Sequence, residues 1–166
     1  MAGARFSVDF DATKTTASLR GLLGSIERPE SLLAELGEYG LRTTRERFKS
    51  QTAPDGTAWA ALQPWYKKEK SQNKNRILTQ RGFLRGQLVS QVVNGKSVEI
   101  GSNLIYSAVH QFGATITPTR GRFLRFNGHV AKSVTIPARP YLGLSDEDRN
   151  EIVERTLEWM QRQLKA

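Results

Sequence analysis

The side chains most suited to acid–base catalysis or metal binding are the two histidines, His110 and His129. Either chemistry needs a histidine beside carboxylates or a nucleophile. The middle of the chain offers only Asp55, Glu69 and Glu99, without a paired-carboxylate spacing. The chain has no cysteine, which excludes thiolate chemistry and disulfides. We therefore expect no enzyme active site, no metal site and no cofactor.

The surroundings of His110 favour a structural role over a catalytic one. His110 falls in a predicted short helix together with Tyr106 and Phe112, and we expect these three side chains to brace a sheet. A hydrogen-bonded structural histidine is the favoured interpretation. The glycines of the chain lie in neither a GxxxxGK[ST] nor a GxGxxG pattern, so no phosphate-binding loop is predicted.

A second candidate for chemistry is a cationic run at residues 67–76, which contains no apolar side chain. Its basic residues are Lys67, Lys68, Lys70, Lys74 and Arg76. Clustered cations of this kind bind DNA phosphates by releasing counterions. The same composition also describes an ordinary exposed and mobile loop, so both interpretations stay open. The arginines at 120, 122 and 125 allow the same phosphate interpretation, although a hairpin turn is commonly charged.

The charge of the whole chain is unevenly distributed. The 166 residues carry a net charge of +9. Residues 51–145 hold 13 basic and 3 acidic side chains, whereas residues 146–166 hold 4 basic and 6 acidic ones. This asymmetry indicates contact with a polyanion or with an acidic protein surface. No apolar run approaches eighteen residues, so we expect no membrane span, and the start of the chain does not resemble a secretion signal.

Helical spacing predicts the elements that would position these residues. Residues 30–50 form the clearest helix, and residues 146–165 form a final helix after the predicted cap Ser145. Shorter helical patterns cover residues 19–26, 77–88 and 104–112. The final helix carries one apolar stripe, which consists of Ile152, Val153, Leu157, Met160 and Leu164.

Strands are predicted between these helices. Asn94-Gly95 joins two apolar runs in a hairpin, and Asn127-Gly128 marks a second turn that leads into a strand at 130–136. Residues 6–10 alternate as a short strand. We predict an α+β fold, with a small antiparallel sheet on which the long helix 30–50 and the C-terminal helix pack. The chain is expected to be a single domain, with a mobile basic loop at 51–80.

Three segments resemble the signatures of one family. The first contains Phe48, Pro54, Asp55, Gly56, Trp59 and Leu62; the second runs through Tyr106, His110, Phe112 and Gly113; the third contains Pro137, Ala138, Arg139, Pro140, Tyr141 and Leu142. In this order they resemble the phage virion morphogenesis family, the tail completion proteins typified by protein G of Mu-like phages. The first thirty residues match less well and form an N-terminal extension.

The resemblance implies a structural protein of the virion. The resemblance implies a tail completion, tail terminator or head-to-tail joining subunit, in a ring of six copies at the head-proximal end of a tail, with a contractile tail favoured. The implied partners are further copies of the chain, the tail tube, the tail sheath, head-completion or connector proteins, and genomic DNA in the channel. A sequence-non-specific DNA-binding protein remains the alternative, and an enzyme such as a nuclease is disfavoured.

Overall fold

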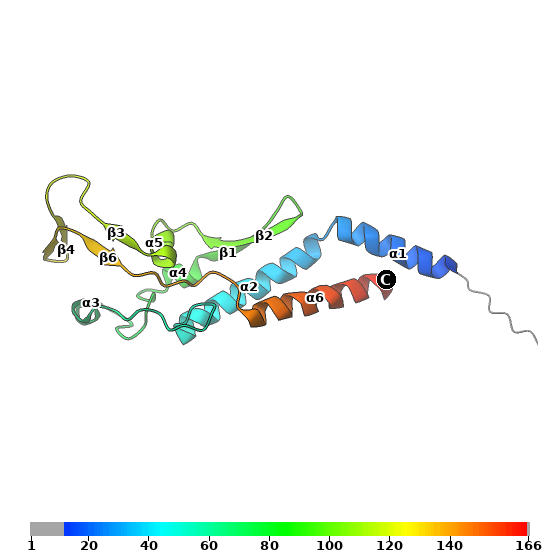
Figure 1. Ribbon diagram of the computed structural model, residues 1–166, viewed down its shortest axis with the longest axis horizontal. Coiled ribbons are helices and arrows are strands. Elements are labelled where there is room, and N and C mark those ends of the chain that lie inside the picture. The colour runs from blue at the N-terminus through cyan, green and yellow to red at the C-terminus, as the bar shows by residue number, and fades with distance from the viewer. Residues whose placement is uncertain (1–11, 166) are drawn as a thin grey trace, which may run out of the picture.

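The long helix α2, Glu30–Ser50, is the central element of the computed structural model, which describes residues 12–165 (Figure 1). Its buried face includes Tyr39, Leu41 and Phe48. The helix ends at Gln51, which adopts the left-handed conformation with φ 61°. The sequence prediction of a helix over 30–50 is confirmed.

One side of α2 carries a hairpin of β1, Leu88–Val93, and β2, Ser97–Ser102. The strands pair in an antiparallel register, and Asn94 and Gly95 adopt positive φ angles at the turn, as the Asn-Gly pair predicts. The hairpin lies close to the helix because α2 has a glycine there. A Cβ on Gly40 would lie 2.3 Å from Ile100 Cδ1.

The C-terminal helix α6, Asp146–Lys165, lies along α2 and also contacts α1, Ala12–Glu27 (Figure 1). Trp159 is buried between the helices, and its indole N–H donates to Ser31 Oγ at 3.0 Å. Arg155 and Arg162 of α6 both form ion pairs with Glu35 of α2. The final helix therefore packs on other helices, whereas the sequence suggested that it packs on the sheet.

The remaining elements lie at the end of the molecule away from α1 (Figure 1). They are the short helices α3, Pro64–Glu69, α4, Phe83–Gly86, and α5, Ser107–Phe112, and the strands β3, Ala114–Ile116, β4, Leu124–Phe126, β5, His129–Ala131, and β6, Val134–Ile136. β3 pairs with β6 and β4 pairs with β5, both antiparallel. The described strands form three two-stranded sheets.

The α+β class, the long helices and the antiparallel strands are confirmed, and the differences are local. The strand predicted over 130–136 divides into β5 and β6, because each half pairs with a different partner. The helix predicted over 77–88 is present only as α4, since Leu78 and Gly82 adopt positive φ. The strand predicted at residues 6–10 lies outside the described residues. Among residues 12–165, no helix combines the length and apolar character needed to cross a membrane.

Candidate functional site

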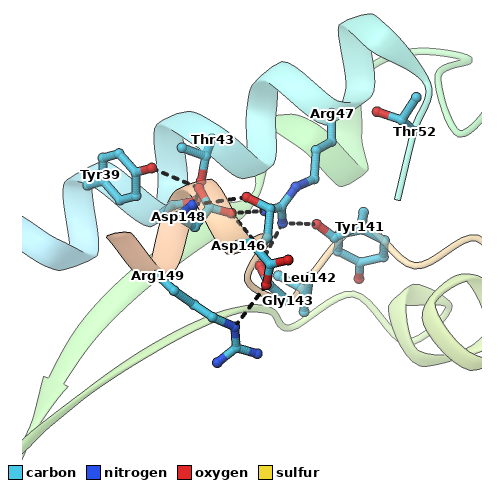
Figure 2. Close-up of polar contacts among 12 residues, drawn as sticks. Tyr39, Thr43, Arg47, Thr52, Tyr141, Leu142, Gly143, Asp146, Asp148 and Arg149 are labelled. Carbon is cyan, nitrogen blue, oxygen red and sulfur yellow. Dashed lines mark hydrogen bonds and ion pairs between the residues drawn. The ribbon is translucent and has the colours of Figure 1, made fainter. Parts of the chain in front are cut away.

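Residues 137–145, which we call the latch, connect β6 to α6 and are held by a buried arginine. The Arg47 guanidinium, from α2, donates to the carbonyl oxygens of Tyr141 and Gly143 at 3.1 and 2.8 Å. It also forms an ion pair with Asp148 at 2.5 Å, and both charged side chains are buried (Figure 2). Burying a charge is costly unless it is paired and hydrogen-bonded. These contacts therefore fix the latch and the start of α6 to α2.

The start of α6 is capped by Ser145 and Asp148. Ser145 Oγ accepts the Asp148 backbone N–H at 3.0 Å, and Asp148 Oδ2 accepts the Ser145 N–H at 2.9 Å. This reciprocal arrangement is a capping box with an aspartate in the glutamate position. The Tyr39 hydroxyl donates to Asp148 Oδ1 at 2.8 Å. The cap predicted at Ser145 is confirmed.

Two ionisable groups at this cap have shifted pKa values. Burial alone would raise the pKa of Asp148. The hydrogen bonds from Ser145 and Tyr39 and the charge of Arg47 lower it by more than burial raises it, so the pKa lies below its ordinary value. Burial and the hydrogen bond to Asp148 raise the pKa of Tyr39 to about 12. At neutral pH the carboxylate is therefore charged and the phenol is neutral.

The loop after α2 is bound to the latch by three hydrogen bonds. The Trp59 indole N–H donates to the Pro140 carbonyl at 2.7 Å. The Arg139 guanidinium donates to the carbonyls of Ala60 and Ala61 at 2.7 and 3.0 Å. Arg139 is buried, and this burial lowers its pKa. Two of the three hydrogen bonds are accepted by backbone carbonyls of the loop, so the path of the loop depends on the Arg139 side chain.

The turn Pro54-Asp55-Gly56 lies at the start of the same loop. Asp55 Oδ1 accepts the Thr57 N–H at 2.9 Å, and this backbone hydrogen bond lowers the Asp55 pKa. Pro54 packs against Gly143, because a Cβ on that glycine would lie 2.9 Å from Pro54 Cγ. The Asp55 carboxylate therefore shapes the turn itself.

Helix α5 contacts the latch through Gln111. Its side-chain oxygen accepts the N–H groups of Tyr141 and Leu142, both at 3.0 Å, and its amide nitrogen donates to the Leu142 carbonyl at 3.0 Å. The Arg139 backbone N–H donates to the His110 carbonyl at 2.8 Å. A single glutamine thus takes the place of a strand partner for the latch backbone.

Gly113 allows the chain after α5 to pass close to the latch. It has φ 73° and ψ 162°, a conformation largely restricted to glycine. A Cβ there would lie 2.8 Å from the backbone nitrogen of Ala138 and 3.0 Å from the Ile136 carbonyl, next to Pro137. The helix ends before Gly113, as a glycine at this position favours, but the extended ψ of Gly113 lies outside the left-handed helical region expected of a glycine cap.

Aromatic packing completes the junction. The ring of Phe48 lies 5.5 Å from Trp59 in an edge-to-face arrangement and 5.4 Å from Tyr141. All three side chains are buried. The first and third segments that the sequence singled out therefore meet in one core, and the second segment contacts the latch through the hydrogen bonds of Gln111 and the His110 carbonyl.

The side chain of Lys70 corrects the expectation that residues 67–76 are all exposed. It is only 3% exposed, and its ammonium group donates to the carbonyls of Asn73, Arg76 and Thr79. Burial lowers its pKa. The other four basic residues are exposed, and Lys67 and Lys68 lie in the helix α3. The loop therefore folds around one of its own lysines.

A small cationic pocket lies beside this loop. It has a volume of about 380 Å³ and is lined by Lys49, Arg76, Arg81 and Arg85, without an acidic residue in its lining. Lys49 pairs with Glu46, whereas the side chains of Arg81 and Arg85 have no hydrogen bond or ion pair among residues 12–165. Sequence reasoning included only Arg76 in its cationic cluster. Lys49 comes from α2 and the pair Arg81 and Arg85 from the segment around α4, and the fold brings them together.

The histidines differ from expectation. His110 Nδ1 is buried without a hydrogen-bond partner among the described residues, and burial followed by the nearby Arg139 charge lowers its pKa. The expectation of a hydrogen-bonded His110 is therefore wrong at this nitrogen, although the ring makes an edge contact with Tyr106. Phe112 is 78% exposed and does not brace a sheet. His129 Nε2 lies 2.6 Å from Glu69 Oε1, a pair that the sequence did not indicate.

The key polar residues that sequence reasoning missed are Arg47, Asp148, Tyr39 and Gln111. Two of them carried a usable signal. Arg47 follows Thr43 by four residues on the apolar face of its helix, and Asp148 follows Ser145 by three, the spacing of a capping box. Gln111 had no comparable signal. Within residues 12–165, no group of three or more His, Cys, Asp or Glu side chains could hold a metal ion.

Comparison with known proteins supplies the evolutionary context. Residues 10–161 match the phage virion morphogenesis family. The chain is 31% identical over 156 residues to the tail completion protein S of Escherichia phage P2, covering 87% of this chain and 93% of that protein. It is 27% identical over 136 residues to the putative capsid assembly protein G of Escherichia phage Mu, covering 80% of each. No solved structure gives a significant match. Because the match extends over most of its length, this chain belongs to the phage virion morphogenesis family.

Proposed function

We propose that this chain is a structural subunit of a bacteriophage virion that completes the tail. The observation that carries the proposal is the family match over residues 10–161, together with the relative named for tail completion. The junction described above supports the proposal, because all three signature segments make structural contacts with the latch. A structural role of this kind suits a virion subunit. The chain would act by binding other virion proteins.

The finer placement is a ring at the head-proximal end of the tail, in the neck. Six copies would surround the channel, and each would contact the tail tube and a connector or head-completion protein, with the sheath as a further partner in a contractile tail. A ring needs two unlike surfaces on each subunit, because its contacts are heterologous. The basic middle and acidic C-terminal part of this chain satisfy that requirement.

A contact with DNA is the second candidate function, and the cationic pocket favours it. Arg81 and Arg85 have no partner among the described residues, and no acid lines the pocket they share with Lys49 and Arg76. Phosphate groups are the polyanion that such a pocket suits. In a ring this contact would be made with the genome in the channel, and in a free protein it would be made with any duplex.

The deciding measurement is the mass of the purified protein in solution at low and high salt, without and with its own tail tubes. A species of six subunits, or capping of tube ends seen by electron microscopy, is expected. Binding of duplex DNA by a monomer that ignores tubes, with an affinity that falls steeply with salt, would instead favour the DNA-binding function. The variant R81E/R85E would then abolish DNA binding, and K96E on the β1–β2 turn provides a matched charge control.

A further inference from the structure

An apolar cleft lies at the end of the molecule away from α1. Its volume is about 890 Å³, and it lies among α3, the residues before α4, and the strands β3, β4 and β6. Three of its large side chains stay substantially exposed: Trp65 at 37%, Phe83 at 53% and Ile116 at 40%. Pockets of this size accept several apolar groups of a ligand or partner. The cleft is therefore a ready site for apolar side chains from outside the chain.

The charge around this cleft has one sign. Its lining contains Lys70, Arg81, Arg125 and Arg139, and no aspartate or glutamate. Lys70 and Arg139 are occupied by backbone carbonyls. The side chains of Arg81 and Arg125 make no hydrogen bond or ion pair with any residue among 12–165. A partner with an apolar surface and nearby carboxylates would match both properties.

Helix α6 presents such a surface. Val153 and Leu157 are 57% and 53% exposed, Leu164 is 40% exposed, and Met160 is partly exposed. These four residues follow one another at intervals of four, three and four, so they form one stripe along the helix. The sequence predicted these four residues together with Ile152, which is only partly exposed, and the structure leaves the stripe largely outside the core, because Trp159 and Asp148 occupy the buried face.

Carboxylates flank the stripe. Glu147, Glu154 and Glu158 are exposed, and none of their carboxylates forms an ion pair or hydrogen bond with another residue in the described part of the chain. They recur at intervals of seven and four, so they lie along one side of the helix beside the stripe. Unpaired acids on α6 therefore complement the unpaired arginines of the cleft.

The two surfaces face different regions of an elongated molecule. The cleft elements α3, β4 and β6 lie at one end, and the C-terminal part of α6 packs on α1 toward the other (Figure 1). One chain cannot bring its own stripe into its own cleft. A second copy can, and the same contact can then repeat from copy to copy.

We propose that the cleft of one copy binds the α6 stripe of the next copy, with Glu154 and Glu158 facing Arg81 and Arg125. The contact follows the helix-in-groove mode, in which side chains at helical spacing enter an apolar groove and charges at its rim set the orientation. This inference rests on the proposed function, since it names the contact that would build the ring.

Charge reversal tests the interface in the full-length chain. The variants E154K/E158K and R81E/R125E each place like charges together, and each is expected to lower the association constant about tenfold or more. The four altered positions are exposed, so circular dichroism spectra should match that of the wild type. Sedimentation velocity over a range of protein concentrations measures the association.

Mixing the two variants gives the sharper result. In a mixture, the lysines of one variant meet the glutamates of the other, while the unaltered surfaces also meet. Alternating copies would therefore reassemble, although each variant alone stays dissociated. The controls K96E and E99K change exposed charges that lie outside the cleft lining and outside α6, and they should keep the wild-type mass.

The outcomes separate the interface from the function. Assembly of E154K/E158K to the wild-type mass, or a mixture that fails to reassemble, would overturn the interface while the ring itself stands. A wild-type protein that stays monomeric and ignores tail tubes would remove the proposed function, and the interface with it. Dissociation of each variant with recovery on mixing would support both.

Discussion

The α2–α6 side of the molecule and the end formed by α3 to β6 use their polar and apolar groups in opposite ways. Beside α2, buried Arg47 and Asp148 are paired with each other and with the latch. At the other end, the strands β3 to β6 contain no fully buried residue, and Phe83, Ile116 and Val130 are all at least 40% exposed. The buried groups between α2 and α6 are paired within the chain, whereas the second region, like the outer stripe of α6, leaves apolar surface available for a partner.

This difference separates substitutions that unfold the subunit from those that leave it folded but unable to assemble. Changes around the latch should act on the free energy of unfolding. Changes at the cleft and on the α6 stripe should act on association. The following experiments test this division, beginning with the largest expected effect on stability.

Arg47→Ala should give the largest loss. It removes the partner of buried Asp148 and two hydrogen bonds to latch carbonyls, and an unpaired buried charge costs about 3–5 kcal/mol. Urea denaturation followed by circular dichroism measures the change in unfolding free energy. Lys49→Ala on the same helix is the control, since its side chain is 59% exposed. Equal losses for the two variants would contradict the role of the buried pair.

Gly113→Ala should cost about 1–3 kcal/mol from backbone conformation, with a further cost from contact with the backbone at Ala138. Gly121→Ala is the matched control. It also has positive φ, at 79°, but its added methyl group would meet nothing within 4 Å. Thermal unfolding of both variants isolates the contribution of the close approach. A loss no greater than that of Gly121→Ala would show that the latch can shift to accept the methyl group.

Lys70→Ala should open the basic loop. The change removes the donor for three backbone carbonyls. A hydrogen bond to a charged group contributes a net stabilisation of about 1.5–3 kcal/mol. Limited digestion with trypsin should cut faster within residues 67–76 in this variant than in Lys68→Ala, whose side chain is exposed. If trypsin cuts the wild type as rapidly as Lys70→Ala within residues 67–76, the result would instead support a loop that is mobile throughout.

The latch should also make stability depend on acid pH. The pKa of Asp148 is lower in the folded chain than in the unfolded one, so its contribution is fully present above the unfolded value near pH 4. That contribution is lost as the pH falls through the folded pKa. Asp148→Asn should lower stability at pH 7 and flatten the decline below about pH 4. Asp146→Asn, at a fully exposed carboxylate, should leave the decline unchanged.

The smallest stability effect is expected at the other end of the molecule. Glu69→Gln weakens the pair with His129, but both side chains are more than one third exposed, and exposed pairs are worth about 0–1 kcal/mol. Urea denaturation should therefore show little change. A loss as large as that of Arg47→Ala would mean that this end contributes to the main core, against the comparison drawn above.

Much of the local structure could be predicted from short-range patterns. The period of apolar residues identified α2 and α6, Ser145 identified the start of α6, and the pairs at Asn94 and Asn127 identified two hairpin turns. Each of these features depends on residues a few positions apart. The family signatures likewise located the segments that converge on the latch.

The same patterns failed where a residue's environment is set by distant segments. Lys70 looks like its neighbours in the sequence, yet three carbonyls as far as Thr79 surround it. The strand at 130–136 divided because β5 and β6 found different partners. The helix at 77–88 shortened because its first residues turn around Lys70, with Leu78 at positive φ.

The sequence by itself determined the long helices α2 and α6, two hairpin turns, the capping of α6 and the opposite charges of the middle and the C-terminal parts, since each follows from neighbouring residue types. Only the tertiary structure decided that Arg47 is buried with Asp148, that Gln111 binds the latch backbone, and that the α6 stripe stays exposed. Burial depends on which segments of the chain meet, and periodicity shows only which residues share a face. For this reason, the candidate assembly surfaces became identifiable once the packing was known.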